Sequence, residues 1–81
     1  MIFLIEYKRL EGRIVTFKTF DQSERTRAEN MRLDLELDLN RKKIDHEVVL
    51  LEAADENAVR KTHRRYFEDI SQIAKSLGDG S

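Results

Sequence analysis

The sequence predicts an α+β fold, a two-layer sandwich with the element order ββαβα, in which two helices pack on one face of a three-stranded sheet. Three observations predict it. β-Branched and aromatic residues crowd positions 2–20, apolar residues recur at helical spacing within 28–39, and an aliphatic run at 48–51 precedes a second helical pattern. At 81 residues the chain has the length of one domain, expected at 1–77 and followed by a flexible tail at 78–81.

Residues 2–20 are expected to form a β-hairpin. A three-residue loop, Leu10–Gly12, places Tyr7 opposite Val15 and Ile5 opposite Phe17, which gives one apolar face. Such a loop needs a left-handed third residue, and glycine adopts that conformation without steric cost. The opposite face, expected to lie away from the helices, is also apolar and carries Ile2, Leu4, Ile14 and Phe20.

The first helix is predicted at about 22–39, where Asp21 and Glu24 have the spacing of a capping box. Residues 33–39 alternate between leucine and acidic residues, which is also the pattern of a strand. The helix is favoured because no β-branched residue lies between positions 26 and 44. The core stripe of this helix is Ala28, Met31, Leu35 and Leu39.

This helix leaves Leu33 and Leu37 one turn apart on the side away from the core. Exposed apolar residues in such a ridge are typical of a partner surface. Asn40 is the expected left-handed residue at the end of the helix.

The third strand is expected at 46–53 and is apolar on both faces within 48–51, which favours a well-covered strand. The strand order 2-1-3 is preferred because it places Phe3 and Ile5 in the centre, and the pair formed by strands one and three is then antiparallel. Asp55 is expected to cap the last helix, at about 56–77. Its core stripe is Val59, His63, Tyr66, Phe67, Ile70, Ile73, Ala74 and Leu77.

The composition limits the classes of function. Fifteen basic and 16 acidic residues give a net charge of −1, which argues against a protein that coats DNA. The absence of cysteine excludes disulfides and thiolate metal sites. The apolar N-terminus is too short for a signal peptide or a membrane span, so a cytoplasmic location is expected by default. No cofactor is expected.

A basic stripe on the last helix is the richest charged cluster: Arg60, Lys61, Arg64 and Arg65, with Arg41, Lys42 and Lys43 as a possible extension. One interpretation is a phosphate-contacting surface for nucleic acid or another polyanion. The favoured alternative is a solvated helix face, since Glu56 precedes Arg60 by four residues and Glu68 follows Arg64 by four.

Neither histidine is predicted to be catalytic or to bind a metal. His63 falls on the apolar face of the last helix, and no residue lies at a spacing that nominates a triad; an enzyme using His63 and Tyr66 is the weakest hypothesis. His46 alone cannot form a metal site. The acidic series Asp34, Glu36 and Asp38 is interpreted as a solvated face, because residues two apart diverge on a helix.

The function we expect is that of a small non-catalytic protein-interaction module that forms a homodimer, and an enzyme is the less favoured interpretation. The runner-up is nucleic-acid or polyanion binding through the basic stripe. The predicted partner-binding residues are the apolar ones left outside the expected core: Leu33, Leu37, Ile2, Leu4, Ile14 and Phe20.

Overall fold

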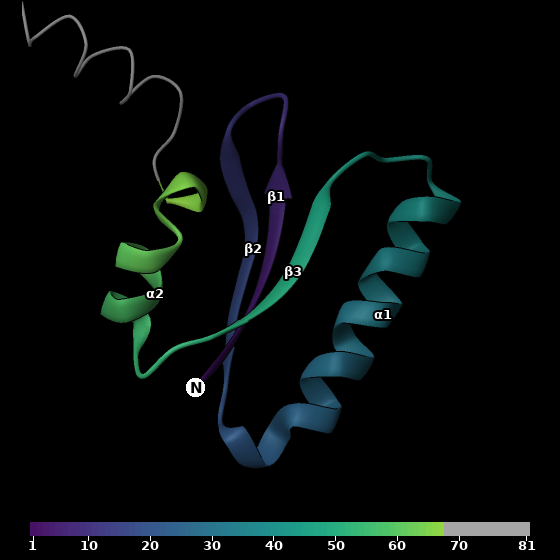
Figure 1. Ribbon diagram of the computed structural model, residues 1–81. Helices are drawn as coiled ribbons and strands as arrows, with labels where there is room; N and C mark the ends of the chain where they lie inside the picture. The colour runs from purple at the N-terminus through teal and green to yellow at the C-terminus, as the bar shows by residue number, and fades with distance from the viewer. Residues whose placement is uncertain (68–81) are drawn as a thin grey trace, which may run out of the picture.

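The computed structural model describes residues 1–67 and contains a three-stranded antiparallel sheet and two helices in the order ββαβα (Figure 1). Strand β1 (Ile2–Lys8) is central, with β2 (Arg13–Phe20) on one side and β3 (Glu47–Glu52) on the other. Both neighbours run antiparallel to β1. The α+β class, the element order, the strand order and the antiparallel pairing of β1 with β3 are therefore confirmed.

Helix α1 (Arg25–Arg41) covers the face of the sheet that we expected to be uncovered. Successive side chains of a strand point to opposite faces, so the even-numbered residues of β1 share one side. Ala28 and Met31 of α1 pack there, on a cluster formed by Ile2, Leu4 and Phe20. The predicted stripe of this helix is confirmed, since Ala28 and Leu39 are buried while Met31 and Leu35 are half buried.

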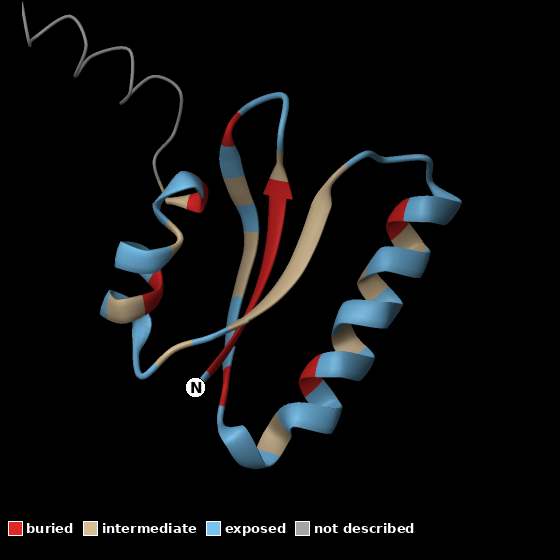
Figure 2. Cartoon of the chain, in the orientation of Figure 1, coloured by how far each residue is buried: buried red, intermediate tan, exposed pale blue. Residues whose placement is uncertain are grey.

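The segment after β3 covers the opposite face. It comprises helix α2 (Glu56–Thr62) and the 3-10 turn η2 (Arg64–Tyr66). Tyr66 packs on Ile5 and Tyr7, with its ring perpendicular to that of Tyr7 at 5.2 Å between centroids. The prediction that both helices lie on one face is wrong, because β1 is apolar and buried on both sides (Figure 2) and each side needs its own cover.

The hairpin register is correct up to Glu6 and differs beyond it. Ile5 pairs with Phe17 as predicted, but a bulge between Glu6 and Tyr7 makes Val15 the extra residue, so Tyr7 pairs with Ile14. Val15 is therefore exposed instead of facing the core, and Ile14 packs against the Tyr7 cluster.

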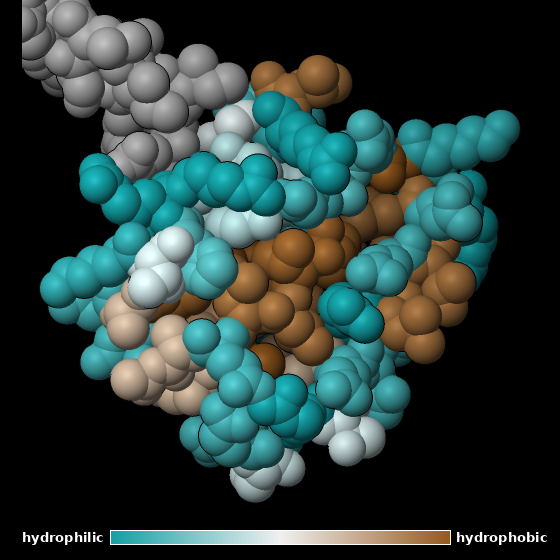
Figure 3. Space-filling model, in the orientation of Figure 1, coloured by the Kyte–Doolittle hydropathy of each residue, from teal (hydrophilic) through white to brown (hydrophobic). Residues whose placement is uncertain are grey.

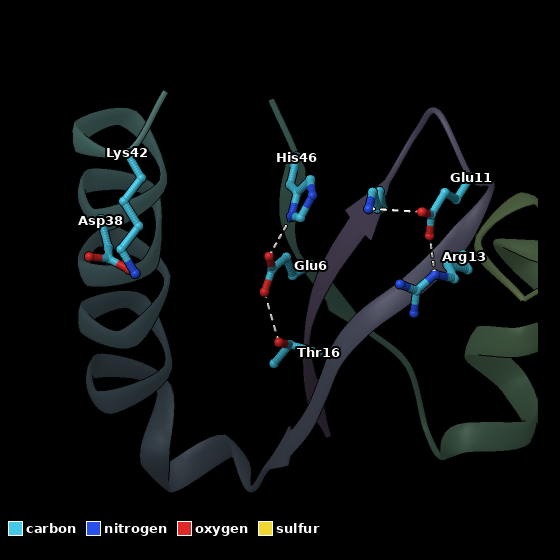
Figure 4. Close-up of polar contacts among 8 residues, drawn as sticks. Glu6, Glu11, Arg13, Thr16, Asp38, Lys42 and His46 are labelled. Atoms are coloured by element: carbon cyan, nitrogen blue, oxygen red, sulfur yellow. Dashed lines mark hydrogen bonds and ion pairs between the residues drawn. The ribbon is translucent and has the colours of Figure 1, made fainter. Parts of the chain in front are cut away.

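The hairpin loop has four residues, 9–12, instead of three. Gly12 has the predicted left-handed backbone, with φ of 64°, and its amide donates to the carbonyl oxygen of Lys8 at 2.8 Å. Glu11 lies between Lys8 and Arg13 (Figure 4), and hydrogen bonds from these two side chains lower the pKa of Glu11 to about 2.

The helix ends follow the expected chemistry with two corrections. The capping box is present at Asp21, whose amide donates to the Glu24 carboxylate, although residues Gln22–Glu24 form a 3-10 turn (η1) before α1 begins. The left-handed residue after α1 is Lys43, with φ of 57°, and not Asn40. The longer helix is closed by the amide of Ile44, which donates to the carbonyl oxygen of Leu39.

Helix α2 begins as predicted, because the Asp55 carboxylate accepts the amide of Ala58 at 2.8 Å. It ends at Thr62, and His63 leaves the helical region, with φ of −125° and ψ of 51°. The predicted helix at 56–77 is therefore confirmed at 56–62 and wrong at 63–67, where the chain forms a turn and the 3-10 segment η2. Its continuation through Ile70, Ile73, Ala74 and Leu77 and the expected tail at 78–81 lie outside the described residues.

Candidate functional site

The sheet edge formed by β3 is the candidate functional site. Four aliphatic residues follow one another at 48–51, and each is only half buried. Apolar side chains gather over β3 between the two helices (Figure 3). The prediction of a well-covered strand is therefore wrong, since β3 is an edge strand whose outer side is open among the described residues. An apolar edge of this kind is a surface on which another chain can pair.

The hydrogen bonds at the end of β3 determine which backbone groups face outward. Met1 and Ala53 exchange both of their backbone hydrogen bonds, at 2.9 and 3.1 Å. In an antiparallel pair, hydrogen-bonded and non-hydrogen-bonded positions alternate. Counting back from Ala53, the next hydrogen-bonded positions are Leu51 and Val49, so the backbone groups of these two residues point to β1. The outward amides and carbonyls of the strand belong to Val48, Leu50 and Glu52.

The other edge of the sheet is protected. Strand β2 contains the bulge at Val15. Three of its residues, Arg13, Lys18 and Thr19, are exposed. Bulges and lysines are the devices by which proteins keep an edge strand from pairing. Strand β3 has no lysine or proline and no bulge, and its only charged residues are Glu47 and Glu52 at its two ends. Within residues 1–67, only the β3 edge is therefore open to pairing.

The predicted partner-binding residues on the sheet do not form a surface. Ile2 and Leu4 are 1% exposed and Phe20 is 5% exposed, because α1 of the same chain covers them. Ile14 points to the opposite face and packs on the cluster around Tyr7. These four assignments are wrong for two reasons: α1 covers the face that carries Ile2, Leu4 and Phe20, and the bulge at Val15 turns Ile14 to the other face.

The predicted ridge on α1 is present. Leu33 is 52% exposed and Leu37 is 51% exposed, and they lie one turn apart. Apolar side chains of α1 are visible beside β3 on the surface shown in Figure 3. Of the other exposed large apolar side chains, Leu10 and Val15 lie on the hairpin, and Ile44 lies between α1 and β3. The ridge and the β3 edge are thus two apolar features that involve neighbouring elements.

A buried polar cluster that the sequence analysis missed lies near the beginning of β3. The carboxylate of Glu6 accepts a hydrogen bond from the hydroxyl of Thr16 at 2.8 Å, and its other oxygen lies 2.6 Å from Nδ1 of His46 (Figure 4). Glu6 is 6% exposed, on the central strand and on the α1 side of the sheet. The three residues come from three neighbouring backbone segments, so the cluster ties the sheet together across its width.

His46 also borders an open hollow of about 340 Å³ between the beginning of β3 and the end of α1. Its wall includes Glu36, Asn40 and Arg9. Both oxygens of Glu6 are engaged, and every buried side-chain nitrogen or oxygen in the described part of the chain has a partner. Within residues 1–67 no three potential ligands gather to hold a metal ion. The cluster thus has the character of a satisfied structural network.

The basic stripe is not continuous. Because α2 ends at Thr62, Arg64 and Arg65 do not extend the face that carries Arg60 and Lys61. Arg60 binds Glu56, as the alternative interpretation predicted, and its guanidinium lies 4.6 Å from the ring centre of Phe67. The proposed extension at 41–43 lies at the end of α1, which is across the sheet from α2 (Figure 1), and Lys42 there pairs with Asp38 at 3.1 Å.

Arg65 is held against the sheet by two partners. Its guanidinium donates to both oxygens of Glu47 at 3.0 Å and lies 4.4 Å from the ring centre of Tyr66. Burial raises the pKa of Glu47, but hydrogen bonds with Tyr66 and Arg65 outweigh it and leave this pKa below its usual value. Burial, followed by the contact with Glu47, raises the pKa of Tyr66. These contacts fix η2 to the first residue of β3.

Comparison of the chain with protein-family models, with curated proteins and with solved structures finds no match. No helix within residues 1–67 is long and apolar enough to cross a membrane. His63 is half buried beside Tyr66, whose ring packs on Tyr7 in the core. The geometry of the β3 edge is therefore the basis for a functional proposal.

Proposed function

We propose that the chain is a non-catalytic protein-interaction module that self-associates. The single observation that supports the proposal is the open β3 edge, which presents four aliphatic residues and the outward backbone groups of Val48, Leu50 and Glu52. Unpaired backbone groups on an apolar edge are strongly disposed to pair with another strand.

The size of the molecule favours association. A domain this small buries only about 60–65% of the surface that its unfolded chain exposes, so additional burial in a complex adds substantially to its stability. The exposed Leu33 and Leu37 provide further apolar surface on α1, a helix that contacts β3. The protected β2 edge restricts pairing to β3, which favours a small complex over an open-ended one.

Polyanion binding has less support. Arg60 and Arg65 are engaged by Glu56 and Glu47, and the two halves of the stripe lie on different backbone elements. Catalysis has no supporting geometry in the described residues either, because the polar cluster at Glu6 is internally satisfied.

The test is sedimentation equilibrium or light scattering of the full chain up to high micromolar concentration. The expected result is a mass above that of one chain, which decreases on dilution. The double variant Leu33→Lys/Leu37→Lys is expected to weaken association if the ridge adjoins the interface, and Leu10→Lys on the hairpin loop is its control. A monomer over the whole concentration range would contradict the proposal.

A further inference from the structure

The occupant of the β3 edge and the geometry of pairing can be derived from the backbone. We infer that a second copy of the chain pairs antiparallel with β3, strand to strand, with Leu50 on the twofold axis. The inference rests on the proposed function and adds the partner, the contact strand and its register. The dimer would contain a continuous six-stranded sheet.

A second copy of β3 can satisfy all of the outward groups of the strand. These groups belong to Val48, Leu50 and Glu52, which are evenly spaced about Leu50. When two such strands run antiparallel with Leu50 opposite Leu50, Val48 lies opposite Glu52 of the second copy, and Glu52 lies opposite its Val48. Every outward amide and carbonyl of the strand then has a partner. No outward group of β3 is left over.

The register is restricted further by the faces of the sheet. A twofold axis that relates two adjacent antiparallel strands is perpendicular to the sheet, so it keeps each face on its own side. Residues opposite each other must therefore both be even-numbered or both be odd-numbered. The smallest allowed shift, to centre on Val49, would pair Val48 with Leu50 but leave the outward groups of Glu52 without a partner from the strand residues of the second copy.

The charges of β3 are compatible with this register. Glu47 and Glu52 end the strand, and in the antiparallel arrangement each lies opposite a neutral residue of the second copy, Ala53 and Val48 respectively. Each acidic residue is also already paired within its own chain, Glu52 with Arg25 and Glu47 with Arg65. Like charges opposite each other would destabilise a strand pair, and this register contains none.

The same arrangement closes the assembly. Each copy uses the β3 edge, which is the only unprotected edge among the described strands, and the outer edges of the six-stranded sheet are the two β2 strands with their bulge and Lys18. An interface that uses the same patch on both copies cannot propagate. The two copies of α1 lie on one face of the combined sheet, and the two copies of the α2 segment lie on the other.

The test uses single cysteines, because the natural chain has none. In the inferred register Leu50 lies opposite its own copy in a hydrogen-bonded pair, with Cα atoms about 5.5 Å apart, within the range of a disulfide. Leu50→Cys is therefore expected to oxidise to a covalent dimer that reductant reverses. Val49→Cys, one residue away, is the matched control and is expected to cross-link several-fold less.

A second measurement covers the case in which the Leu50 variant does not fold. Val49 lies opposite Leu51 of the second copy in this register, so a mixture of Val49→Cys and Leu51→Cys chains is expected to form a mixed covalent dimer. A stronger cross-link through Val49→Cys alone would contradict the register and overturn the inference.

The outcomes separate the inference from the proposed function. A chain that is dimeric by light scattering but forms no cross-link at positions 49–51 overturns the β3 pairing and leaves self-association standing, with the Leu33–Leu37 ridge as the remaining interface. A monomeric chain, the result expected if another segment of the same chain or a different protein occupied the edge, overturns both.

Discussion

Replacing Glu6 with leucine tests whether the buried carboxylate stabilises the sheet. In the native protein this carboxylate accepts a hydrogen bond from Thr16 and contacts Nδ1 of His46, at 2.8 and 2.6 Å. Leucine has a similar volume but no acceptor. Glu6→Leu therefore leaves the Thr16 hydroxyl and the His46 ring without their partner in a largely dry environment.

The size of the effect follows from the burial of the two groups. A buried donor that loses its acceptor costs about 1–3 kcal/mol. The side chain of His46 is 14% exposed and Thr16 is half buried. Because both groups keep some contact with water, we expect the destabilisation from each to lie near the lower limit of this range. Together they amount to about 2–3 kcal/mol, and the apolar surface added by leucine offsets part of it, which leaves about 2 kcal/mol.

The assay is urea unfolding followed by circular dichroism at one fixed protein concentration. With a slope of about 1–2 kcal/mol per molar for a small domain, the midpoint is expected to fall by about 1–2 M. Thr16→Val alone is expected to destabilise by about 1 kcal/mol, but in the Glu6→Leu background it removes an unpartnered hydroxyl and is expected to be neutral or stabilising.

The result that refutes this reasoning is a Glu6→Leu variant at least as stable as the native chain. It would mean that the free-energy cost of removing the carboxylate from water exceeds the stabilisation that its two contacts provide, as occurs for some buried ionic groups. Additive effects of Glu6→Leu and Thr16→Val would likewise contradict an energetic coupling between the two side chains.

Three further predictions concern local features. Gly12→Ala is expected to cost about 1 kcal/mol in thermal or urea unfolding, because φ at this position is 64°, whereas Leu10→Ala in the same loop is expected to change little. Asp55→Ala removes the acceptor of the Ala58 amide and is expected to cost about 1 kcal/mol, with lost helicity in the far-ultraviolet circular dichroism. The pKa of Glu47 is lowered in the folded chain, so its contribution to the free energy of unfolding is present above its ordinary pKa of 4.5 and is lost as the pH falls below that value. Glu47→Gln is expected to flatten the acid limb of the stability–pH profile, and an unchanged profile would contradict the assignment.

The sequence predicts the local elements well because their signals are local. The capping pair Asp21 and Glu24, the left-handed Gly12 and the Asp55 cap each depend on a few neighbouring residues. The helical assignment of 33–39 is confirmed because leucine, glutamate and arginine favour a helix over the strand that the alternation also fits. The two exposed leucines follow directly from that helix.

The arrangement of the helices could not be predicted from local signals. Both faces of β1 are apolar, and the pattern does not show which face a given helix will cover. The bulge at Val15 is equally hidden, since it reflects how the sheet twists and not a particular residue type. Each error exchanged core and surface positions. Ile14, expected on the open face, packs against a core cluster, and Val15, expected to face the core, is exposed.

The sequence contains a signal for the polar cluster around Glu6. Glu6 is the only charged residue inside β1, since Lys8 stands at the end of the strand, and the predicted pairing already placed Glu6 beside Thr16. A charge inside a central strand requires partners on the neighbouring strands. With β3 next to β1, the residues that begin β3 are the available candidates, and His46 is the one that the structure places there.

Strand β3 presents a mismatch between its sequence and its position. Four consecutive aliphatic residues are typical of a strand that is covered on both faces and paired on both sides. In the monomer β3 has helices on both faces, but on one side it has no neighbour among the described residues. In the dimer that we propose, a second copy of β3 would supply the missing neighbour and satisfy all of the outward backbone groups of the strand. The composition of β3 is therefore explained better by a sheet that continues across two chains than by the three-stranded sheet alone.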